Sequence, residues 1–483
     1  MTQKQRNILG IFLTVSFLIT APIVILYAMG YRISRGIFEE GAPAVQLTGG
    51  LRVRTSLPYD VTVNGEYLNT SPLYRVGLPV GSISVKLDRD GFVPWEKELA
   101  VKESTVTLVD KPILFPENPT FQFPAGLLES IDESFKSPTD TSVIFRVGRE
   151  LYFLDESEST PILIATLQVE EILETVVWNE SNSSGILTTR VGGRVNYFLF
   201  DLSTGNPVQV NLVSLTNIFP YDTQLTPVDL LKFDGSQVFF EQGGHIRSYN
   251  LSLDDLEPIL VSDVQEAEMF GSSLVYIVEG TSELIRYDVG SDDAVSLAQS
   301  YDESLKKYFT NPEDTFILTE SGILQSFEVA TEDSIQDQGV DDVEYQVTEL
   351  PFEDPVQNFF VSVNDQKLLV FTESEISIVY LDDFQTYTTR TRGEVSTLYT
   401  SEESAIVGAR FLLFDAEYVL FLENGSLKAV ELDDRDTPQV YEFGQSITFF
   451  DWETQGTNLV IKVVQDGNYG SLKFPFRRLL PLL

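Results

Sequence analysis

KLLVFTESEISIVYLD, residues 367–382, decides the fold, because it places two apolar runs on either side of a short polar turn and ends on an acid. Val, Ile, Phe and Tyr fill much of both runs, and β-branched and aromatic residues are typical of strands. Two such runs joined by a tight turn predict an antiparallel hairpin. The same pattern recurs seven more times, at residues 142–155, 186–201, 237–251, 273–288, 315–328, 418–433 and 458–474.

The spacing of the eight copies predicts what the hairpins build. Their turn centres are 37 to 53 residues apart and lie at Gly148, Gly193, Gly243, Gly280, Gly322, Glu375, Gly425 and Gly467. Periods of about 40–50 residues with hairpins are typical of propeller blades of four strands each. Solenoids of helix pairs share this period, but the copies alternate at period two and lack long amphipathic helices. Residues 117–483 are therefore predicted to form a β-propeller of about eight blades, with seven as the alternative if two copies share a blade.

A ring of blades has to be closed by strand pairing between its two ends, because an open ring would leave unpaired strand edges. Two apolar segments are candidates for the closing strand. They are the stretch around Phe121-Gln122-Phe123 and the segment Leu472 to Phe476.

Residues 51–115 have a different character, because short strands of strictly alternating polarity follow one another with turn signals between them. Ser82-Ile83-Ser84-Val85-Lys86-Leu87 is one example of this period of two, and Asn64-Gly65 is a strong tight-turn signal. Five or six strands in about 65 residues predict a small β-sandwich. The whole chain is thus predicted to be all-β apart from its N-terminal segment.

The sandwich region resembles the PEGA domains of bacterial envelope proteins. The resemblance is carried by Pro58, Val61, Val63, Asn64-Gly65, Ser71-Pro72, Leu78, Gly81, Ile83, Val85, Leu87, Gly91, Phe92 and Trp95. The tetrapeptide that names the family stands here as Pro58-Tyr59-Asp60-Val61. The resemblance implies an extracytoplasmic spacer or adhesion module and carries no catalytic residue over to this chain.

Turn sequences before several of the repeated hairpins resemble those of TolB-like and WD40-like propellers. They are Ser137-Pro138-Thr139-Asp140, Asp234-Gly235, Asn311-Pro312-Glu313-Asp314 and Asn364-Asp365. Each of these motifs is short, so the resemblance implies an architecture and no activity.

The N-terminal segment predicts a membrane anchor. Residues 8–29 are 22 uncharged residues, and a helix of that length spans about 33 Å, enough for a hydrocarbon core of about 30 Å. A cleavable signal peptide is the alternative, but its apolar core usually has about 7–15 residues. Lys4 and Arg6 precede the span, which favours a cytoplasmic N-terminus and a single-pass cell-membrane protein with extracytoplasmic domains. The predicted order is tail and transmembrane helix at 1–35, linker at 36–50, sandwich at 51–115 and propeller at 117–483.

The charge of the chain limits its partners. The formal net charge is −41, and residues 116–483 alone carry −43. Such a field repels phosphate backbones, which excludes nucleic acid as an expected partner, and it favours cations or basic proteins. An acidic surface that only keeps the protein soluble is the simpler explanation of the same charge.

No catalytic, cofactor-binding or metal-binding residue can be assigned from the sequence. The chain has no cysteine, and its single histidine, His245, has no visible nucleophile or orienting acid beside it. Asp88-Arg89-Asp90-Gly91 resembles the start of a calcium loop but lacks the third ligand and the distal Glu, and it fits a strand-to-turn step better. Acidic pairs follow several hairpins, and turn chemistry explains them more simply than metal ligation does; they are Asp254-Asp255, Asp292-Asp293, Asp382-Asp383 and Asp433-Asp434.

Two functions from different classes fit these features. The favoured one is a membrane-anchored extracytoplasmic binding or scaffold protein that presents an acidic propeller to a protein or an envelope polymer. The alternative is an envelope hydrolase or lyase that uses carboxylates at the propeller channel. Three or more Asp or Glu side chains within about 10 Å at the channel mouth would favour the enzyme.

Overall fold

The fold was analysed in a computed structural model of the chain. It describes residues 3–28, 31–34, 44–122, 131–136, 142–155, 161–179, 184–201, 213–215, 228–270, 272–291, 293–299, 301–310, 314–329, 345–362, 366–385, 388–401, 404–412, 417–455, 457–466 and 468–475. Every regular element in these ranges except α1 (Gln3–Ala28) is a strand. The predicted all-β class is therefore confirmed.

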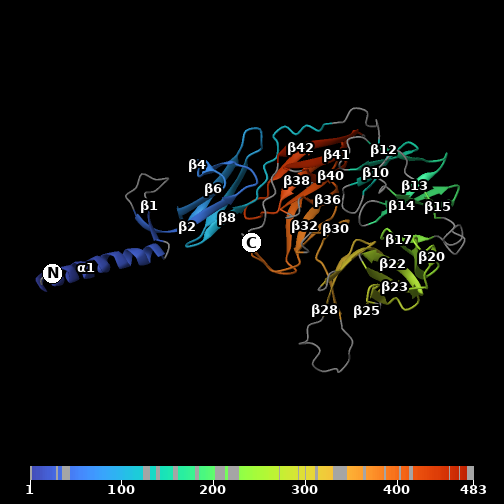
Figure 1. Cartoon of the computed structure of the whole chain (residues 1–483), viewed down its shortest axis with the longest axis horizontal. Helices are drawn as coiled ribbons and strands as arrows, with labels where there is room; N and C mark the ends of the chain where they lie inside the picture. The colour runs from blue at the N-terminus through green and yellow to red at the C-terminus, as the bar shows by residue number, and fades with distance from the viewer. Residues whose placement is uncertain are drawn as a thin grey trace, which may run out of the picture.

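The helix α1 extends away from the sheets at the N-terminal end (Figure 1). Large apolar side chains between Phe12 and Leu26 are exposed along it. Within the described ranges, no helix has both the length and the apolar character that crossing a membrane requires. The transmembrane helix expected within residues 1–35 thus stays a prediction.

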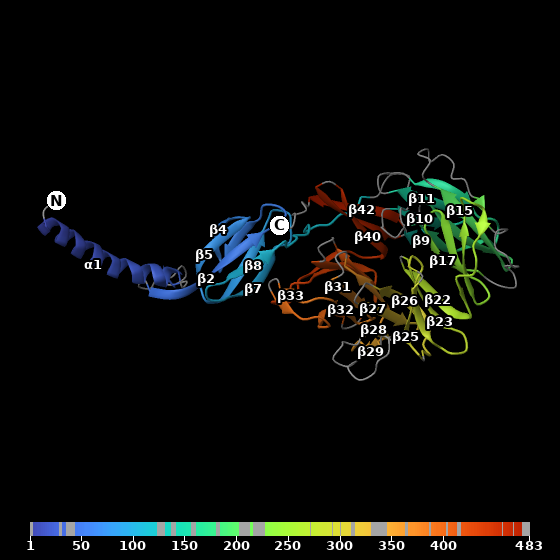
Figure 2. The same ribbon diagram turned by 60° about the horizontal axis from the view of Figure 1, so that its bottom comes forward.

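The sandwich contains two four-stranded sheets, and it lies between α1 and the remaining sheets (Figure 2). One sheet is formed by β1 (Tyr31–Ser34), β2 (Ala44–Arg54), β5 (Leu73–Pro79) and β8 (Val106–Asp110), with β2 and β8 parallel. The other is formed by β4 (Glu66–Thr70), β3 (Asp60–Val63), β6 (Gly81–Asp88) and β7 (Trp95–Val101). Alternate residues of β7 are buried from Trp95 to Val101, as the period of two predicts. Asn64 and Gly65 both have positive φ, 49° and 81°, as a two-residue hairpin turn requires.

The expected linker at 36–50 is wrong in its second half. Residues 44–50 belong to β2, which pairs with β1 and β5, and residues 35–43 lie outside the described ranges. Gly49 is needed for close packing, because a Cβ there would lie 2.4 Å from the carbonyl oxygen of Lys102. The strand count was also low, since seven strands from β2 to β8 replace the expected five or six.

Within the described ranges, eight further sheets of three or more strands follow in chain order, from teal to red in Figure 1. Sheet 1 contains β9 (Glu133–Lys136), β10 (Ser142–Val147), β11 (Glu150–Asp155) and β12 (Ile162–Thr166). Sheet 2 contains β13 (Ile172–Trp178), β14 (Ser184–Val191), β15 (Arg194–Asp201) and β16 (Val213–Ser214). Sheet 3 contains β17 (Asp229–Phe233), β18 (Gln237–Glu241), β19 (His245–Asn250), β20 (Asp255–Leu256) and β21 (Val261–Ser262). Sheet 4 contains β22 (Val264–Phe270), β23 (Ser273–Val278), β24 (Leu284–Asp288) and β25 (Asp293–Ala298).

The second half of the series repeats this plan. Sheet 5 contains β26 (Leu305–Thr310), β27 (Asp314–Thr319), β28 (Leu324–Val329) and β29 (Tyr345–Glu349). Sheet 6 contains β30 (Asn358–Val361), β31 (Lys367–Phe371), β32 (Glu375–Tyr380) and β35 (Val395–Thr400), and a side hairpin joins β33 (Phe384–Gln385) to β34 (Thr389–Arg390). Sheet 7 contains β36 (Ile406–Leu412), β37 (Tyr418–Glu423), β38 (Ser426–Glu431) and β39 (Val440–Gly444). Sheet 8 contains β40 (Ile447–Gln455), β41 (Asn458–Gln465) and β42 (Asn468–Pro475).

Each of the eight hairpins expected from the sequence is present as the second and third strands of one sheet. These hairpins are β10–β11, β14–β15, β18–β19, β23–β24, β27–β28, β31–β32, β37–β38 and β41–β42. The repeat pattern therefore identified the second and third strands of each of these eight sheets.

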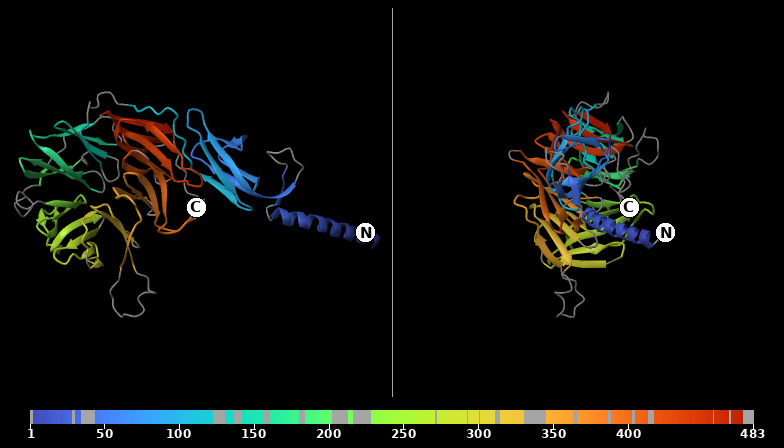
Figure 3. Two further views of the ribbon diagram at one scale, coloured as in Figure 1. Left: turned by 180° about the vertical axis from the view of Figure 1, so that it is seen from behind. Right: turned by 90° about the vertical axis from the view of Figure 1, so that its left-hand side faces the viewer.

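Neighbouring sheets pack through buried apolar side chains, with one cluster for each pair of consecutive sheets. An eighth cluster joins the last sheet to the first, because Phe145 of β10 packs with Val464 of β41 and Tyr469 of β42. The same proximity of sheets 8 and 1 is visible from behind in Figure 3. The series of sheets thus returns to its starting point.

The segment before sheet 1 supplies an additional pairing to sheet 8. The amide of Gln122 donates to the carbonyl oxygen of Ser471 (2.7 Å), and the amide of Ser471 donates to that of Gln122 (3.0 Å). Phe121 is buried in the cluster between sheets 7 and 8. The segment around Phe121, one of the two candidates for a closing strand, therefore pairs with β42 at one residue pair.

Candidate functional site: an acidic cavity

A cavity of about 720 Å³ lies where the first strands of sheets 2, 3, 4 and 5 meet. Six carboxylates line it: Glu174 on β13, Asp229 on β17, Glu241 at the end of β18, Glu266 and Glu268 on β22, and Glu320 beside the β27–β28 turn. Pockets of about 300–1,000 Å³ are typical of small-ligand sites. This cavity is the candidate functional site.

Three of the carboxylates already have partners within the protein. Glu174 forms an ion pair with Arg190, whose second guanidinium nitrogen lies 3.2 Å from the other carboxylate oxygen. The amide of Gly244 donates to Glu241 (2.7 Å), and the amide of Leu305 donates to Glu266 (3.1 Å). These contacts hold the three side chains in place at the cavity wall.

Glu268 has the most perturbed carboxyl group in the cavity. Burial raises the pKa of Glu268 to about 7, and the nearby negative charges of Glu266, Glu320 and Asp229 add to the rise. Burial also raises the pKa of Glu241 and of Glu266. Like charges in a partly desolvated space disfavour further ionisation, so these carboxyl groups hold their protons to higher pH than an exposed glutamate does.

The rest of the lining is mainly aliphatic. It includes Val177, Val195, Val228, Leu230, Leu231, Ala267 and Leu305. Thr188 on β14 also lines the cavity; it is 7% exposed, and its hydroxyl has no hydrogen-bond partner. A buried hydroxyl without a partner is costly, which makes it a natural contact for a ligand.

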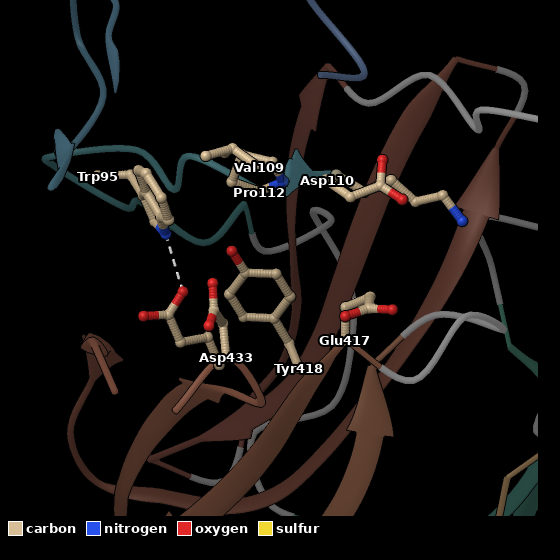
Figure 4. A pocket seen from close by; sticks show the side chains of 9 residues that line it. Trp95, Val109, Asp110, Pro112, Glu417, Tyr418 and Asp433 are labelled. Atoms are coloured by element: carbon tan, nitrogen blue, oxygen red, sulfur yellow. Dashed lines mark hydrogen bonds between the residues drawn. The ribbon is translucent and has the colours of Figure 1, made fainter. Parts of the chain in front are cut away.

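A second feature, the junction between the sandwich and sheet 7, is structural. Lys97 of β7 and Glu431 of β38 form an ion pair of 2.8 Å with side chains 0% and 3% exposed. The indole of Trp95 donates to Glu431 (2.8 Å), the bond that Figure 4 marks with a dashed line. The amide of Gln439 donates to the other carboxylate oxygen (3.0 Å). The volume there accessible to water is about 10 Å³, too small for an organic ligand.

Further bonds cross the same junction. Arg435 donates to the carbonyl oxygen of Leu108 (2.6 Å), and the amide of Glu98 donates to Asp436 (3.0 Å). Tyr418 accepts a bond from the amide of Ile113 (2.9 Å) and lies between Asp433 and Glu417 in Figure 4. The sandwich is thereby fastened to sheet 7.

The residues singled out in the sequence lie elsewhere. His245 is the first residue of β19, half-buried, and does not line the cavity. Asp88 ends β6, and Gly91 follows with a φ of 79°, which fits the strand-to-turn interpretation of this motif. Arg89 lies over the ring of Phe92.

The acidic pairs sit next to turns and bond locally. The amide of Asp383 donates to Asp382 (2.7 Å), and the amide of Arg392 donates to Asp383 (3.1 Å). Asp254 accepts from Tyr249, and Asp433 accepts from Arg435 (2.8 Å). The geometry fits turn chemistry; Asp292 lies outside the described ranges. Within those ranges, no group of three or more acidic or histidine side chains could hold a metal ion.

Sequence reasoning missed the cavity carboxylates, although one signal was available. The first strands of sheets 2, 3 and 4 each carry an acid, and β22 carries Glu266 and Glu268 two residues apart on one face. These first strands belong to consecutive sheets and contribute their acids to the same cavity. Lys97 was missed as well, since its contact Glu431 is 334 positions away.

Comparison with known proteins supports the assignment of the sandwich. Residues 48–113 match the family model of the PEGA domain, which confirms the resemblance seen at 51–115. This match covers most of the sandwich, from within β2 to just beyond β8. No curated protein matches the chain.

Solved structures resemble the chain only distantly. Hsv2 of Kluyveromyces lactis is 10% identical, with a TM-score of 0.42 over 65% of this chain and 97% of that one. A eukaryotic initiation factor is 10% identical, with a TM-score of 0.44 over 76% and 92%. PorZ of Porphyromonas gingivalis, a surface component of a type-IX secretion system, is 10% identical, with a TM-score of 0.37 over 73% and 46%. The part of the chain that can be assigned is therefore residues 48–113, which are similar to PEGA domains.

Proposed function

We propose that this protein is a membrane-anchored, extracytoplasmic binding protein that presents the acidic cavity to a ligand on a partner protein or an envelope polymer. The observation that carries the proposal is the cavity itself, about 720 Å³ in size and lined by six carboxylates on neighbouring sheets. Such a site favours cationic ligands and disfavours nucleic acid.

The proposal includes a β-propeller of eight blades, formed by sheets 1–8. Its support is the eight clusters between consecutive sheets, the last of which joins sheet 8 to sheet 1. The pairing of Gln122 with Ser471 adds a β-bridge to the edge strand β42 of sheet 8, which has three strands within the described ranges. A ring held in this way is a rigid support for a central ligand site.

The anchor is supported by the sequence and by the exposed helix. Residues 8–29 contain no charge, and apolar side chains along α1 from Phe12 to Leu26 are exposed. Water is an unfavourable environment for so much apolar surface, whereas a bilayer is a favourable one. β1 follows α1 after two residues, so the sandwich would stand close to the membrane.

Topology and binding are tested together in intact cells. Protease added outside should degrade the chain after about residue 36, and cross-linking with the full-length chain as bait should capture a partner. The capture should be lost in the E266Q/E268Q variant and kept in E103Q/E353Q, which removes two exposed carboxylates outside the cavity. Protection of residues 116–483 from protease, or capture that is equal in both variants, would contradict the proposal.

An envelope hydrolase or lyase is the second candidate, and Glu268 is the observation that favours it. A carboxyl group with a pKa of about 7 can act as a general acid, and Glu266 beside it could act as the base. E268Q would then abolish turnover of an envelope polymer while substrate still binds. If the protein only binds, neither the parent chain nor E268Q releases product from the polymer. Chromatography of the polymer after incubation with each protein measures this.

A further inference from the structure

We propose that the cavity binds a flexible organic cation with two or more protonated primary amines, such as a free polyamine or the lysine side chains of a basic peptide. The inference rests on the proposed binding function and names the chemistry of its ligand. Two features of the cavity carry it: the distribution of its carboxylates and the nature of the surface between them.

The carboxylates are spread over several sheets rather than gathered at one point. Asp229 lies on sheet 3, Glu266 and Glu268 on sheet 4, and Glu320 on sheet 5. Within the described ranges they do not form a group that could hold a metal ion. A ligand with several separated ammonium groups can contact several of these carboxylates at once, whereas a single compact ion cannot.

Aliphatic side chains lie between the charges, together with some polar ones. Val228, Leu230 and Leu231 from sheet 3 and Ala267 from sheet 4 line the same space as the acids. Methylene chains between amines would bury apolar area against these side chains, at about 25 cal/mol per Å². A divalent metal cation gains nothing from such a surface, because its preferred ligands are oxygen atoms.

Thr188 supplies an independent indication of a ligand. Its side chain is 7% exposed and lines the cavity, and its hydroxyl oxygen has no partner among the described residues. An ammonium group is a donor without acceptor capacity, so it can satisfy that oxygen directly. The cavity wall thus contains one buried hydroxyl acceptor in addition to the carboxylates.

Binding of this cation should release a proton. Glu268 faces Asp229, Glu266 and Glu320, and the wall also contains Glu174, Glu241 and the cation Arg190. A bound ammonium group would oppose the negative charges that help to keep Glu268 protonated, and its pKa of about 7 would fall. Affinity should therefore rise about tenfold between pH 6 and pH 8, with up to one proton released per ligand.

The test is isothermal titration calorimetry of the full-length chain with spermidine, and in parallel with a short lysine-rich peptide. Saturable binding of either ligand that strengthens from pH 6 to pH 8 is expected. E266Q/E268Q should weaken it at least tenfold, and E103Q/E353Q should change it less than twofold. Thr188→Val should weaken it about threefold without lowering the melting temperature, because the hydroxyl has no partner within the protein.

The two ligands separate the sources of the amine. Tighter binding of spermidine indicates a free polyamine, and tighter binding of the peptide indicates lysines of a partner protein. Equal weakening by E266Q/E268Q and E103Q/E353Q would indicate diffuse attraction and overturn the inference. If neither ligand binds while cross-linking still depends on Glu266 and Glu268, the amine inference is wrong and the binding function stands; if cross-linking is also unaffected, both are wrong.

Discussion

The substitution Lys97→Met tests how strongly the sandwich is fastened to sheet 7. The ammonium group of Lys97 is fully buried, 2.8 Å from a carboxylate oxygen of Glu431. It also donates to the carbonyl oxygen of Asp433. Methionine preserves most of the volume and the apolar contacts of the side chain but leaves Glu431 without its counter-charge.

The size of the effect follows from what remains around Glu431. Removing one partner of a buried ion pair costs about 3–5 kcal/mol. Trp95 and the amide of Gln439 still donate to the carboxylate, so the loss should be near the lower end, about 3 kcal/mol at pH 7. Burial already raises the pKa of Glu431, and Lys97 opposes that rise; without Lys97 the pKa rises further.

The pH dependence has a definite sign. A carboxyl group whose pKa is raised in the folded state keeps its proton there and loses it when unfolded, so stability falls as pH rises above the unfolded value. Each pH unit is worth at most about 1.4 kcal/mol. The loss caused by Lys97→Met should therefore shrink by about 2 kcal/mol between pH 7 and pH 5.

Urea unfolding of the full-length chain, followed by circular dichroism, measures this at both pH values. Glu431→Gln keeps an acceptor for Trp95 and removes the charge, and the double variant K97M/E431Q should recover at least half of the single-variant loss. A loss below about 1 kcal/mol for K97M, or a loss that is the same at both pH values, would refute the reasoning.

Three further predictions concern the packing between sheets 7 and 8, the cavity and the net charge of the chain. Phe121→Ala should lower the unfolding free energy by about 3–4 kcal/mol and Phe121→Leu by less than about 1.5 kcal/mol, because the ring fills the core between sheets 7 and 8; equal effects in thermal unfolding would contradict this packing. Glu268→Gln should stabilise the chain by about 1–2 kcal/mol at pH 8 and not at pH 4. The pKa of Glu268 is raised to about 7, so the unfolding free energy of the parent chain falls as pH rises towards 7. An unchanged pH profile in urea unfolding would argue against this prediction. NaCl should raise the melting temperature of a chain with a net charge of −41, with MgCl₂ and CaCl₂ acting alike at matched ionic strength; a saturable shift with calcium alone would indicate a metal site.

The hairpins could be predicted because their information is local. Each combines a period of two with a turn residue, and Gly148, Gly193 and Gly280 have φ values of 59°, 81° and 84°. These are left-handed conformations that favour glycine. A pattern of about 15 residues therefore contained the whole signal, and it identified the second and third strands of sheets 1–8.

The errors and omissions arose where distant segments meet. Gly49 and Gly50 look like a flexible connector in the sequence, but Gly49 is required because β2 approaches the carbonyl oxygen of Lys102. Lys97 stands between Trp95 and Leu99 on the buried face of β7, where alternation alone predicts an apolar residue. Only the position of Glu431 explains it. The cavity was missed for the same reason. Its acids lie on strands of different sheets, and these strands come together only through the packing of consecutive sheets.

The segment that connects the sandwich to sheet 1 links these long-range features. Ile113 and Phe115 are buried in the same cluster as Phe121, between sheets 7 and 8. Phe115 alone contacts four aromatic rings, with centroid distances of 4.7 to 5.8 Å. One short stretch thus leaves the sandwich, fills the core of sheets 7 and 8, and ends in the pairing of Gln122 with Ser471. Since the same stretch carries the sandwich and pairs with the last strand, the orientation of the sandwich and the closure of the sheets depend on each other, and loosening one should loosen the other.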